Sequence, residues 1–302
     1  MLVIELGLVL LALLIAAIFP RAGSRVFLQL EHSLALLAHR RRLAIAVVGI
    51  LALGLRLAVL PIEPIPDPVV HDEFSHLLLA DTLAHGRLAN PIHPMWIHFE
   101  TFHVNQKPTY SSMYYPGQGS FLAVGKVLFG DPFWGVWLSV GLMCAAICWA
   151  LQAWLPPFWA FIGGLLAVIR VGTVSYWANS YWGGAVTALG GALVIGALPR
   201  IVRHHRVRDA GLMGLGFALI GFTRPFEGLF FGLAVMATLV IWLRRNNRPP
   251  LPLVIRQIAF PLATVLAVAL AAMGFYFWRV TGSPFRVPYQ VNMAMYHLVY
   301  FP

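Results

Sequence analysis

Runs of apolar residues long enough to cross a membrane constrain the fold of this 302-residue chain more than any other feature. We predict eight such runs, at 2–18, 43–60, 133–154, 158–174, 184–199, 209–223, 226–243 and 257–278. A helix needs about 20 mostly apolar residues to cross the hydrocarbon core of a bilayer. Charged residues make up only 11% of the chain, whereas roughly 25% is usual in a soluble domain. The sequence therefore predicts an all-α, polytopic membrane protein and excludes a disordered, coiled-coil or disulfide-stabilised chain.

Basic residues gather in three of the connections between these runs. Thirteen of the 21 lysines and arginines lie in 19–42, 200–208 and 244–256. Helices that cross alternately place these three connections on one face, and basic connections mark the cytoplasmic face. The long connection 61–132 is then expected on the outer face. Contact with anionic lipid accounts for the net charge of +10, so no nucleic acid partner is expected.

The chain divides into two parts on this pattern. Residues 1–42 hold the first apolar run and a basic cytoplasmic loop, and residues 43–302 form the transmembrane core with its outer loop. The run 2–18 has no basic residue before it, so it lacks the charged start of a signal peptide. We interpret this run as a retained anchor whose N-terminus lies outside.

The outer loop 61–132 carries seven of the 11 acidic residues and six of the 11 histidines. A long loop in a chain with otherwise short connections is usually functional. Its proline-rich start is expected to be extended. Residues 71–81 are predicted to form a short amphipathic helix that ends near Gly86 and lies in the membrane interface. A turn at 114–119 is followed by a second predicted interfacial helix, 120–129.

Two carboxylates, Asp72 and Glu73, lie at the start of the first short helix. They could cap the helix and complement its dipole, or a carboxylate there could act as a general base at the membrane surface. His76 follows Asp72 by four residues and lies on the same helical face. Together with His71, these side chains could also bind a divalent cation, but the spacing is too common to assign a metal.

Three arginines lie inside the apolar runs or at a break between them: Arg56, Arg170 and Arg224. All three are expected near the outer ends of their helices. They could extend to the lipid headgroups, or they could form an anion site for phosphate or diphosphate. The proline at position 225 interrupts the apolar runs 209–223 and 226–243, which predicts a tight helical hairpin. Glu227, close to Arg224, could instead neutralise that arginine.

Further candidates for ligand binding lie in the outer connections. Lys107 could pair with a phosphate. Aromatic, imidazole and amide side chains suited to stacking on sugars and hydrogen bonding with them are His103, Tyr115, Asn179, Tyr181 and Trp182. Aromatic residues in these positions could equally form an ordinary belt at the membrane surface. The sequence contains no glycine-rich phosphate loop, Ser/His/Asp arrangement or zinc-spaced Cys/His cluster.

The order of these features resembles the GT-C membrane glycosyltransferases, which use polyprenyl-phosphate sugars. The likeness covers roughly 43–245 and rests on the acidic pair Asp72-Glu73 after an early span, a juxtamembrane helix, a Tyr-Pro-Gly turn at 115–117 and a Thr-Arg-Pro-x-Glu-Gly break at 223–228. Within that family, the chain is most similar to the bacterial branch that contains lipid A aminoarabinose transferases and protein O-mannosyltransferases.

This resemblance implies an inverting sugar transfer in which Asp72 is the catalytic base, Glu73 is its partner, and Lys107 and Arg224 bind the donor phosphate. Asn179 stands where such enzymes often place a second acidic residue, and an amide cannot act as a base. That departure puts a two-carboxylate mechanism in doubt.

The resemblance also implies a place in the cell and a set of partners. We expect a multi-pass protein of a bacterial inner membrane whose catalytic loop faces the periplasm. The expected partners are a polyprenyl-phosphate-linked sugar, a lipid, glycan or protein acceptor, and membrane lipids, with a divalent cation as the one cofactor considered. Such enzymes commonly have more spans or an outer domain, so we expect a shortened relative or a piece of a longer enzyme.

Two other functions fit the same residues. A transporter or flippase of an anionic lipid or lipid-linked sugar usually carries charges near the bilayer midplane and an inverted repeat, whereas the charges here are expected at one face. A non-catalytic membrane assembly subunit would use the outer loop to bind a partner. We favour the transferase, which requires Asp72 and Arg224 to line one cavity that opens outward.

Overall fold

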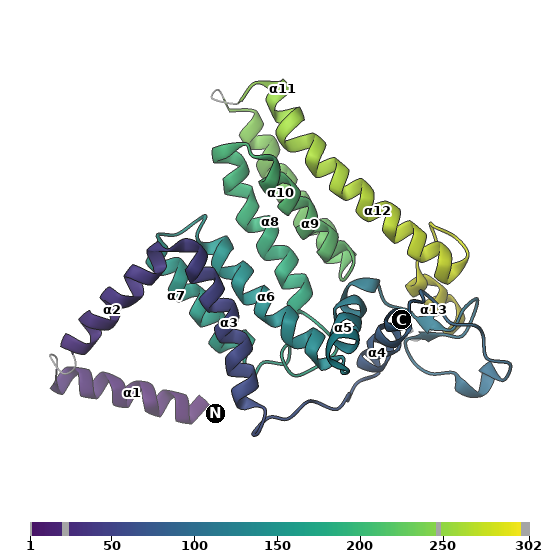
Figure 1. Cartoon of the computed structure of the whole chain (residues 1–302), viewed down its shortest axis with the longest axis horizontal. Helices are drawn as coiled ribbons and strands as arrows, with labels where there is room; N and C mark the ends of the chain where they lie inside the picture. The colour runs from purple at the N-terminus through teal and green to yellow at the C-terminus, as the bar shows by residue number, and fades with distance from the viewer. Residues whose placement is uncertain (1, 20–23, 246–248, 297–302) are drawn as a thin grey trace.

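The computed structural model describes residues 2–19, 24–245 and 249–296, which are helical apart from connecting loops and one small hairpin (Figure 1). The α-helices are α1 (Leu2–Ile18), α2 (Ser24–His39), α3 (Arg41–Val59), α4 (His71–Ala84), α5 (Pro116–Phe129), α6 (Phe133–Leu151), α7 (Pro157–Ala167), α8 (Ala185–His204), α9 (Val207–Gly221), α10 (Pro225–Leu243), α11 (Leu251–Val254), α12 (Phe260–Thr281) and α13 (Pro288–Tyr296). A 3-10 helix η1 (Trp96–Phe99), π-helical turns η2 (Val168–Gly172) and η3 (Ile255–Ala259), and strands β1 (Val104–Asn105) and β2 (Ser111–Ser112) complete the elements. The all-α prediction is confirmed.

Five helical segments of the described chain are long and apolar enough to cross a membrane. They are α3, α6, α8, α10 and the continuous stretch from α11 through α12. The other three predicted runs are also helical but shorter: α1, α7 with η2, and α9, which has 15 residues. Helices α10 and α12 leave most of their apolar surface exposed, as helices that face lipid do. A membrane protein is therefore plausible, with five of the eight predicted spans meeting the length needed.

The region 19–42 differs from the predicted basic loop, because most of it forms helix α2. Leu34 and Leu37 of this helix pack against the core, and Ala38 is fully buried. This spacing of three and four residues is the pattern of an amphipathic helix. The arginines around it led to the prediction of a loop instead. Two of the basic residues in the predicted cytoplasmic connections, Arg21 and Arg248, lie outside the described residues.

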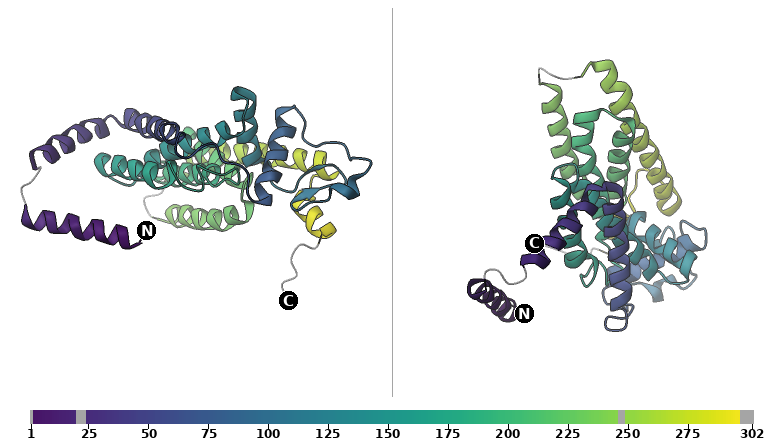
Figure 2. Two further views of the ribbon diagram at one scale, coloured as in Figure 1. Left: turned by 90° about the horizontal axis from the view of Figure 1, so that it is seen from below. Right: turned by 60° about the vertical axis from the view of Figure 1, so that its left-hand side comes forward.

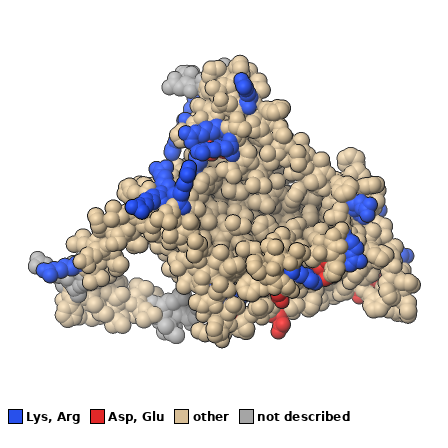
Figure 3. Space-filling model, viewed as in Figure 1, with Lys and Arg blue, Asp and Glu red and all other residues tan. Residues whose placement is uncertain are grey.

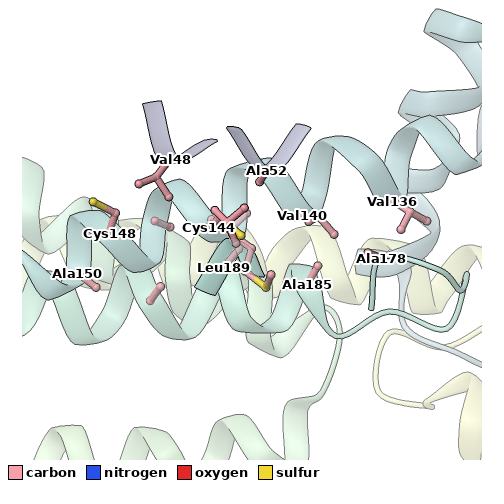
Figure 4. Packing of buried hydrophobic residues seen from close by; sticks show 14 of the residues in the cluster. Val48, Ala52, Val136, Val140, Cys144, Cys148, Ala150, Ala178, Ala185 and Leu189 are labelled. Atoms are coloured by element: carbon pink, nitrogen blue, oxygen red, sulfur yellow. The ribbon is translucent and has the colours of Figure 1, made fainter. Parts of the chain in front are cut away.

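Helix α6 lies at the centre of the main core, between α3, α7 and α8 (Figure 4). Small side chains let these helices approach closely, among them Ala52 of α3 and the free, buried cysteines Cys144 and Cys148 of α6. Helix α5 crosses α6 so tightly that a Cβ atom added to Gly125 would lie 2.0 Å from the backbone nitrogen of Gly135. This packing holds α5, and with it the neighbouring α4, at a defined place beside the bundle.

The elements of the outer loop gather with α13 at one end of the long helices (Figure 2). Lysine and arginine side chains gather over the opposite ends of α3, α8 and α9, while smaller groups of them lie at the loop end, beside most of the acidic side chains of the same view (Figure 3). Within the loop, the predicted short helices are present as α4 and α5, and α5 begins four residues earlier than expected. The predicted break at 223–225 is present too, since α9 ends at Gly221 and α10 begins at Pro225.

Candidate functional site

A cavity of about 450 Å³ opens where the helix ends α4, α5, α8, α10 and α13 meet. Its polar and aromatic lining residues are Asp72, His76, Tyr114, Tyr115, Gln118, Trp182, Thr187, Thr223, Arg224, Phe226, Glu227 and Tyr289. The structure thus brings Asp72 and Arg224, which are far apart in the sequence, to one cavity, as the sequence predicted. Among the other predicted residues, Tyr115 and Trp182 line it as well.

Glu73 fixes the start of α4 and does not line this cavity. Its Oε2 accepts hydrogen bonds from the backbone N–H groups of Val69 at 2.8 Å and Val70 at 3.1 Å, and its Oε1 accepts one from Tyr181 at 2.8 Å. The side chain is 2% exposed. Because both oxygens are engaged by backbone donors, Glu73 caps the helix and ties it to the loop before α8. The expected role as a catalytic partner of Asp72 does not fit this geometry.

Asp72, one residue earlier, points into the cavity and has polar neighbours on two sides. The hydroxyl of Tyr114 donates a hydrogen bond to its Oδ1. The Nδ1 atom of His103 lies 3.6 Å from its Oδ2, although His103 itself does not line the cavity. His76, one turn along α4, stacks on Tyr114 with ring centroids 4.5 Å apart. The partnership with Tyr114 was not predicted, because nothing in the sequence links positions 72 and 114.

Burial controls the charge of the groups around Asp72. It lowers the pKa of His76 to about 4, although the nearby Asp72 acts in the opposite direction. Burial also lowers the pKa of His103. Burial, reinforced by the hydrogen bond to Asp72, raises the pKa of Tyr114 above its ordinary value. At neutral pH both imidazoles are therefore uncharged and the phenol keeps its proton.

Arg224 stands at the start of α10 and lines the cavity. Its Nη1 lies 3.0 Å from Oε1 of Glu227, so the neutralisation considered from the sequence is present. Both side chains are about half exposed, at 45% and 56%. An ion pair this exposed contributes at most about 1 kcal/mol. An incoming phosphate could therefore replace the carboxylate at the guanidinium group at little cost.

The two predicted turns meet at this site. The N–H of Gly117 donates to the carbonyl of Phe222 at 2.7 Å, and a Cβ added to Gly117 would lie 2.5 Å from Cγ2 of Thr223. The hydroxyl of Thr187, on α8, donates to that of Thr223 at 2.9 Å. Only glycine fits at position 117, and its contact sets the distance between the α5 wall and the Arg224 wall.

The C-terminal segment also contributes to the cavity, through Tyr289 of α13. The side-chain amide of Asn105 donates to the carbonyl of Pro288 at 3.0 Å, and that of Asn292 donates to the carbonyl of Val104 at 3.1 Å. These bonds seat α13 on the β1–β2 hairpin. No sequence signal pointed to this contact, because isolated asparagines carry no information about distant partners.

Two of the three predicted arginines lie away from the cavity. Arg56 is 1% exposed, and its guanidinium donates to the carbonyls of Glu63 at 3.0 Å, Pro64 at 3.4 Å and Ala178 at 3.4 Å. Its donors join the connection after α3 to the connection before α8, and Arg56 does not line the cavity where a phosphate would bind. Arg170 lies exposed in the π-helical turn η2 and does not line the cavity either.

The remaining predicted residues have local partners. Lys107 places its Nζ atom 4.0 Å from the ring centroid of Trp96, outside the cavity. The amide of Asn179 donates to the carbonyl of Ser175 at 3.1 Å, within its own loop. Tyr181 is buried, and its backbone binds Glu73. None of these three side chains reaches the cavity with Asp72, so the structure does not group them with the site.

The divalent-cation alternative fails on geometry. Across the described residues, no three His, Cys, Asp or Glu side chains stand where they could share a metal ion. His71 packs instead against Phe102, with ring centroids 4.9 Å apart, while His76 stacks on Tyr114. The predicted set of His71, Asp72 and His76 is therefore not a metal site in this structure.

Comparison with known proteins adds no relative. No protein-family model matches the sequence, no curated protein matches it, and no solved structure matches the fold. The resemblance to the GT-C glycosyltransferases accordingly stays a prediction that rests on the residues described above.

Proposed function

We propose that this chain is a multi-pass membrane glycosyltransferase of the GT-C type, which moves a sugar from a polyprenyl-phosphate donor to a lipid, glycan or protein acceptor. One observation carries the proposal: Asp72 and Arg224 line the same cavity, together with the aromatic rings of Tyr115 and Trp182. A carboxylate suits the acceptor, a guanidinium group suits the donor phosphate, and aromatic faces suit the sugar between them.

In the proposed reaction, Asp72 takes the proton of the acceptor hydroxyl or amine. The freed electron pair attacks the anomeric carbon on the face opposite the phosphate, and the bond from that carbon to the phosphate oxygen breaks. Arg224 stabilises the negative charge that develops on the leaving phosphate, while Glu227 gives up its contact with the guanidinium. The hydroxyl of Tyr114 holds the carboxylate of Asp72 in place. The result is inversion at the anomeric carbon.

The same proposal includes an orientation in a bacterial inner membrane. The basic ends of α3, α8 and α9 would face the cytoplasm, so the cavity would open to the periplasm. Cysteine placed at position 72 should then react with a membrane-impermeant maleimide added to intact spheroplasts. Labelling only after the cytoplasmic side is exposed would contradict this orientation and the proposed acceptor.

The position of the cavity favours an enzyme over a transporter. Its lining residues come from helix ends and from the turns between them, such as the start of α8 and the break at 223–225. A transporter usually holds its substrate near the bilayer midplane, between discontinuous helices. The charged residues of this cavity, Asp72, Arg224 and Glu227, lie at one end of the long helices instead.

The test compares membranes that contain wild-type protein with membranes that contain Asp72→Asn. Both receive radiolabelled polyprenyl-phosphate donors carrying mannose, glucose, galactose or aminoarabinose, and transfer to endogenous acceptors is counted. We expect the variant to insert normally and to lose activity at least 100-fold, since a general base contributes about 10²–10⁴-fold. Asp67→Asn, the same change at an exposed position of the same loop, is the control. Full activity in Asp72→Asn would exclude this carboxylate from the reaction.

A further inference from the structure

His76 is the buried titratable residue of the cavity that the proposed mechanism leaves unused. It lies one turn after Asp72 on α4, is 6% exposed, and lines the cavity. Its Nδ1 atom is buried and has no hydrogen-bond partner within the described part of the chain. A buried polar atom without a partner is unfavourable and rare in folded proteins. Because Nδ1 has almost no accessible surface, the ring meets the cavity through the edge that carries Nε2, and a ligand can form a hydrogen bond with the ring there.

The ring of His76 is held in a fixed orientation. It stacks on Tyr114 with 22° between the ring planes, and the hydroxyl of Tyr114 is itself bound to Asp72. Burial, supported by the charges of Arg224 and His103, outweighs the opposite effect of Asp72, so that the pKa of His76 falls to about 4. The imidazole is therefore neutral at cellular pH, with one N–H donor and one acceptor nitrogen.

Three other neutral polar side chains of the cavity, Gln118, Thr187 and Thr223, already have partners. The amide of Gln118 donates to the carbonyl of Tyr181 at 3.1 Å. The hydroxyl of Thr187 donates to Thr223, whose own hydroxyl donates to the carbonyl of Leu219 at 2.8 Å. His76 differs from these groups because its hydrogen-bonding capacity is unused. A neutral ring suits a hydroxyl group, whereas a phosphate or carboxylate would call for a cation.

We propose that His76 is a specificity residue, which hydrogen-bonds one hydroxyl group of the sugar that occupies this cavity. This inference rests on the proposed function, and it adds how the donor sugar is selected. A site built to bind a particular hydroxyl rejects the analogue that lacks it, because a buried protein group is then left without a partner. Discrimination between a sugar and its deoxy analogue therefore measures the contact directly.

The experiment uses the donor of the four-sugar panel that wild-type membranes transfer best, together with its monodeoxy analogues. Wild type should discriminate against one analogue by roughly tenfold in kcat/KM, the loss expected for one hydrogen bond in a buried site. His76→Phe keeps a ring that can stack on Tyr114 but has no nitrogen, so its discrimination against that analogue should fall to about one- to twofold. Each value is a ratio within one membrane sample, so it does not depend on the amount of folded enzyme.

Two further variants make the result specific. His76→Gln keeps a donor and an acceptor, so it should retain part of the discrimination that His76→Phe loses. His98→Phe makes the same change at an exposed position of the same loop, and it should keep the wild-type pattern. If His76→Phe still transfers sugar and keeps the wild-type discrimination, the inference is overturned and the proposed function stands. Failure of wild-type membranes to transfer any of the four sugars would overturn the proposed function and this inference with it.

Discussion

Replacement of Glu73 by glutamine separates a structural carboxylate from a catalytic one. The carboxylate accepts three backbone hydrogen bonds, two through Oε2 from Val69 and Val70 and one through Oε1 from Tyr181. A glutamine of nearly the same shape has only one oxygen. That oxygen can accept the hydrogen bonds of Val69 and Val70, or the one of Tyr181. In either case the NH₂ group faces an N–H donor on the other side.

The cost follows from the burial of each bond. A hydrogen bond to a charged group contributes about 1.5–3 kcal/mol. The bond to Tyr181 is buried, so its loss should cost close to 3 kcal/mol. Loss of the charge at the two partly buried bonds and at the helix start adds about 1 kcal/mol. We expect Glu73→Gln to destabilise the protein by about 3–4 kcal/mol, which lowers Tm by about 5–6 °C in a chain of this size.

The assay is thermal unfolding of detergent-purified protein, followed by tryptophan fluorescence at a single scan rate, because membrane proteins often unfold irreversibly. The matched control is Glu31→Gln, on an exposed position of α2, with an expected Tm within about 1 °C of wild type. A Glu73→Gln protein that unfolds within 2 °C of wild type would refute the capping argument. If it also lost sugar transfer, Glu73 would belong to the reaction itself.

Three further predictions follow from contacts at the cavity. Tyr114→Phe removes the hydroxyl that holds Asp72, so kcat for sugar transfer should fall roughly tenfold with little change in KM, as initial rates will show; an unchanged kcat would contradict that role. Gly117→Ala forces a methyl group into the backbone at the end of α9, so the folded protein measured by size-exclusion chromatography should largely disappear. The control is Gly191→Ala, whose added methyl group has no neighbour within 4 Å, and it should behave as wild type. His76 is neutral when folded down to a pKa of about 4 but takes up a proton near pH 6.5 when unfolded, so stability should fall by up to about 3 kcal/mol between pH 6.5 and 4; His76→Phe should flatten this dependence in thermal scans, and an equally steep curve in the variant would contradict it.

Local rules predicted the elements that carry the site. Apolar runs marked the helices, and proline at 225 marked the break between α9 and α10, because proline cannot continue a helix. Asp72 and Arg224 were expected together because both follow the outer end of a predicted span. That inference needed only the alternation of crossing helices, and the cavity contains both residues.

Residue type alone could not separate a ligand-binding charge from a structural one. Arg56 was predicted to bind phosphate because a charge inside an apolar run is usually functional. Its actual partners are backbone carbonyls, one of them at Ala178, which is 122 positions away along the chain. Glu73 raises the same difficulty beside Asp72, because adjacent helical residues point about 100° apart. The backbone of Tyr181 binds Glu73, and Asp72 is the carboxylate that lines the cavity. The sequence gives no sign of the contact between Tyr181 and Glu73.

The seating of α13 on the β1–β2 hairpin has a consequence for the order in which the protein matures. The bond between Asn292 and Val104 joins positions that are 188 residues apart, and Tyr289 of the same helix lines the cavity. A ribosome releases the hairpin long before it releases α13, since chains emerge from their N-terminal side. The cavity between α4 and α10 therefore lacks the part of its lining that Tyr289 supplies until α13 has been synthesised. The lining of the cavity is therefore completed only after α13 has been synthesised and has packed on the hairpin.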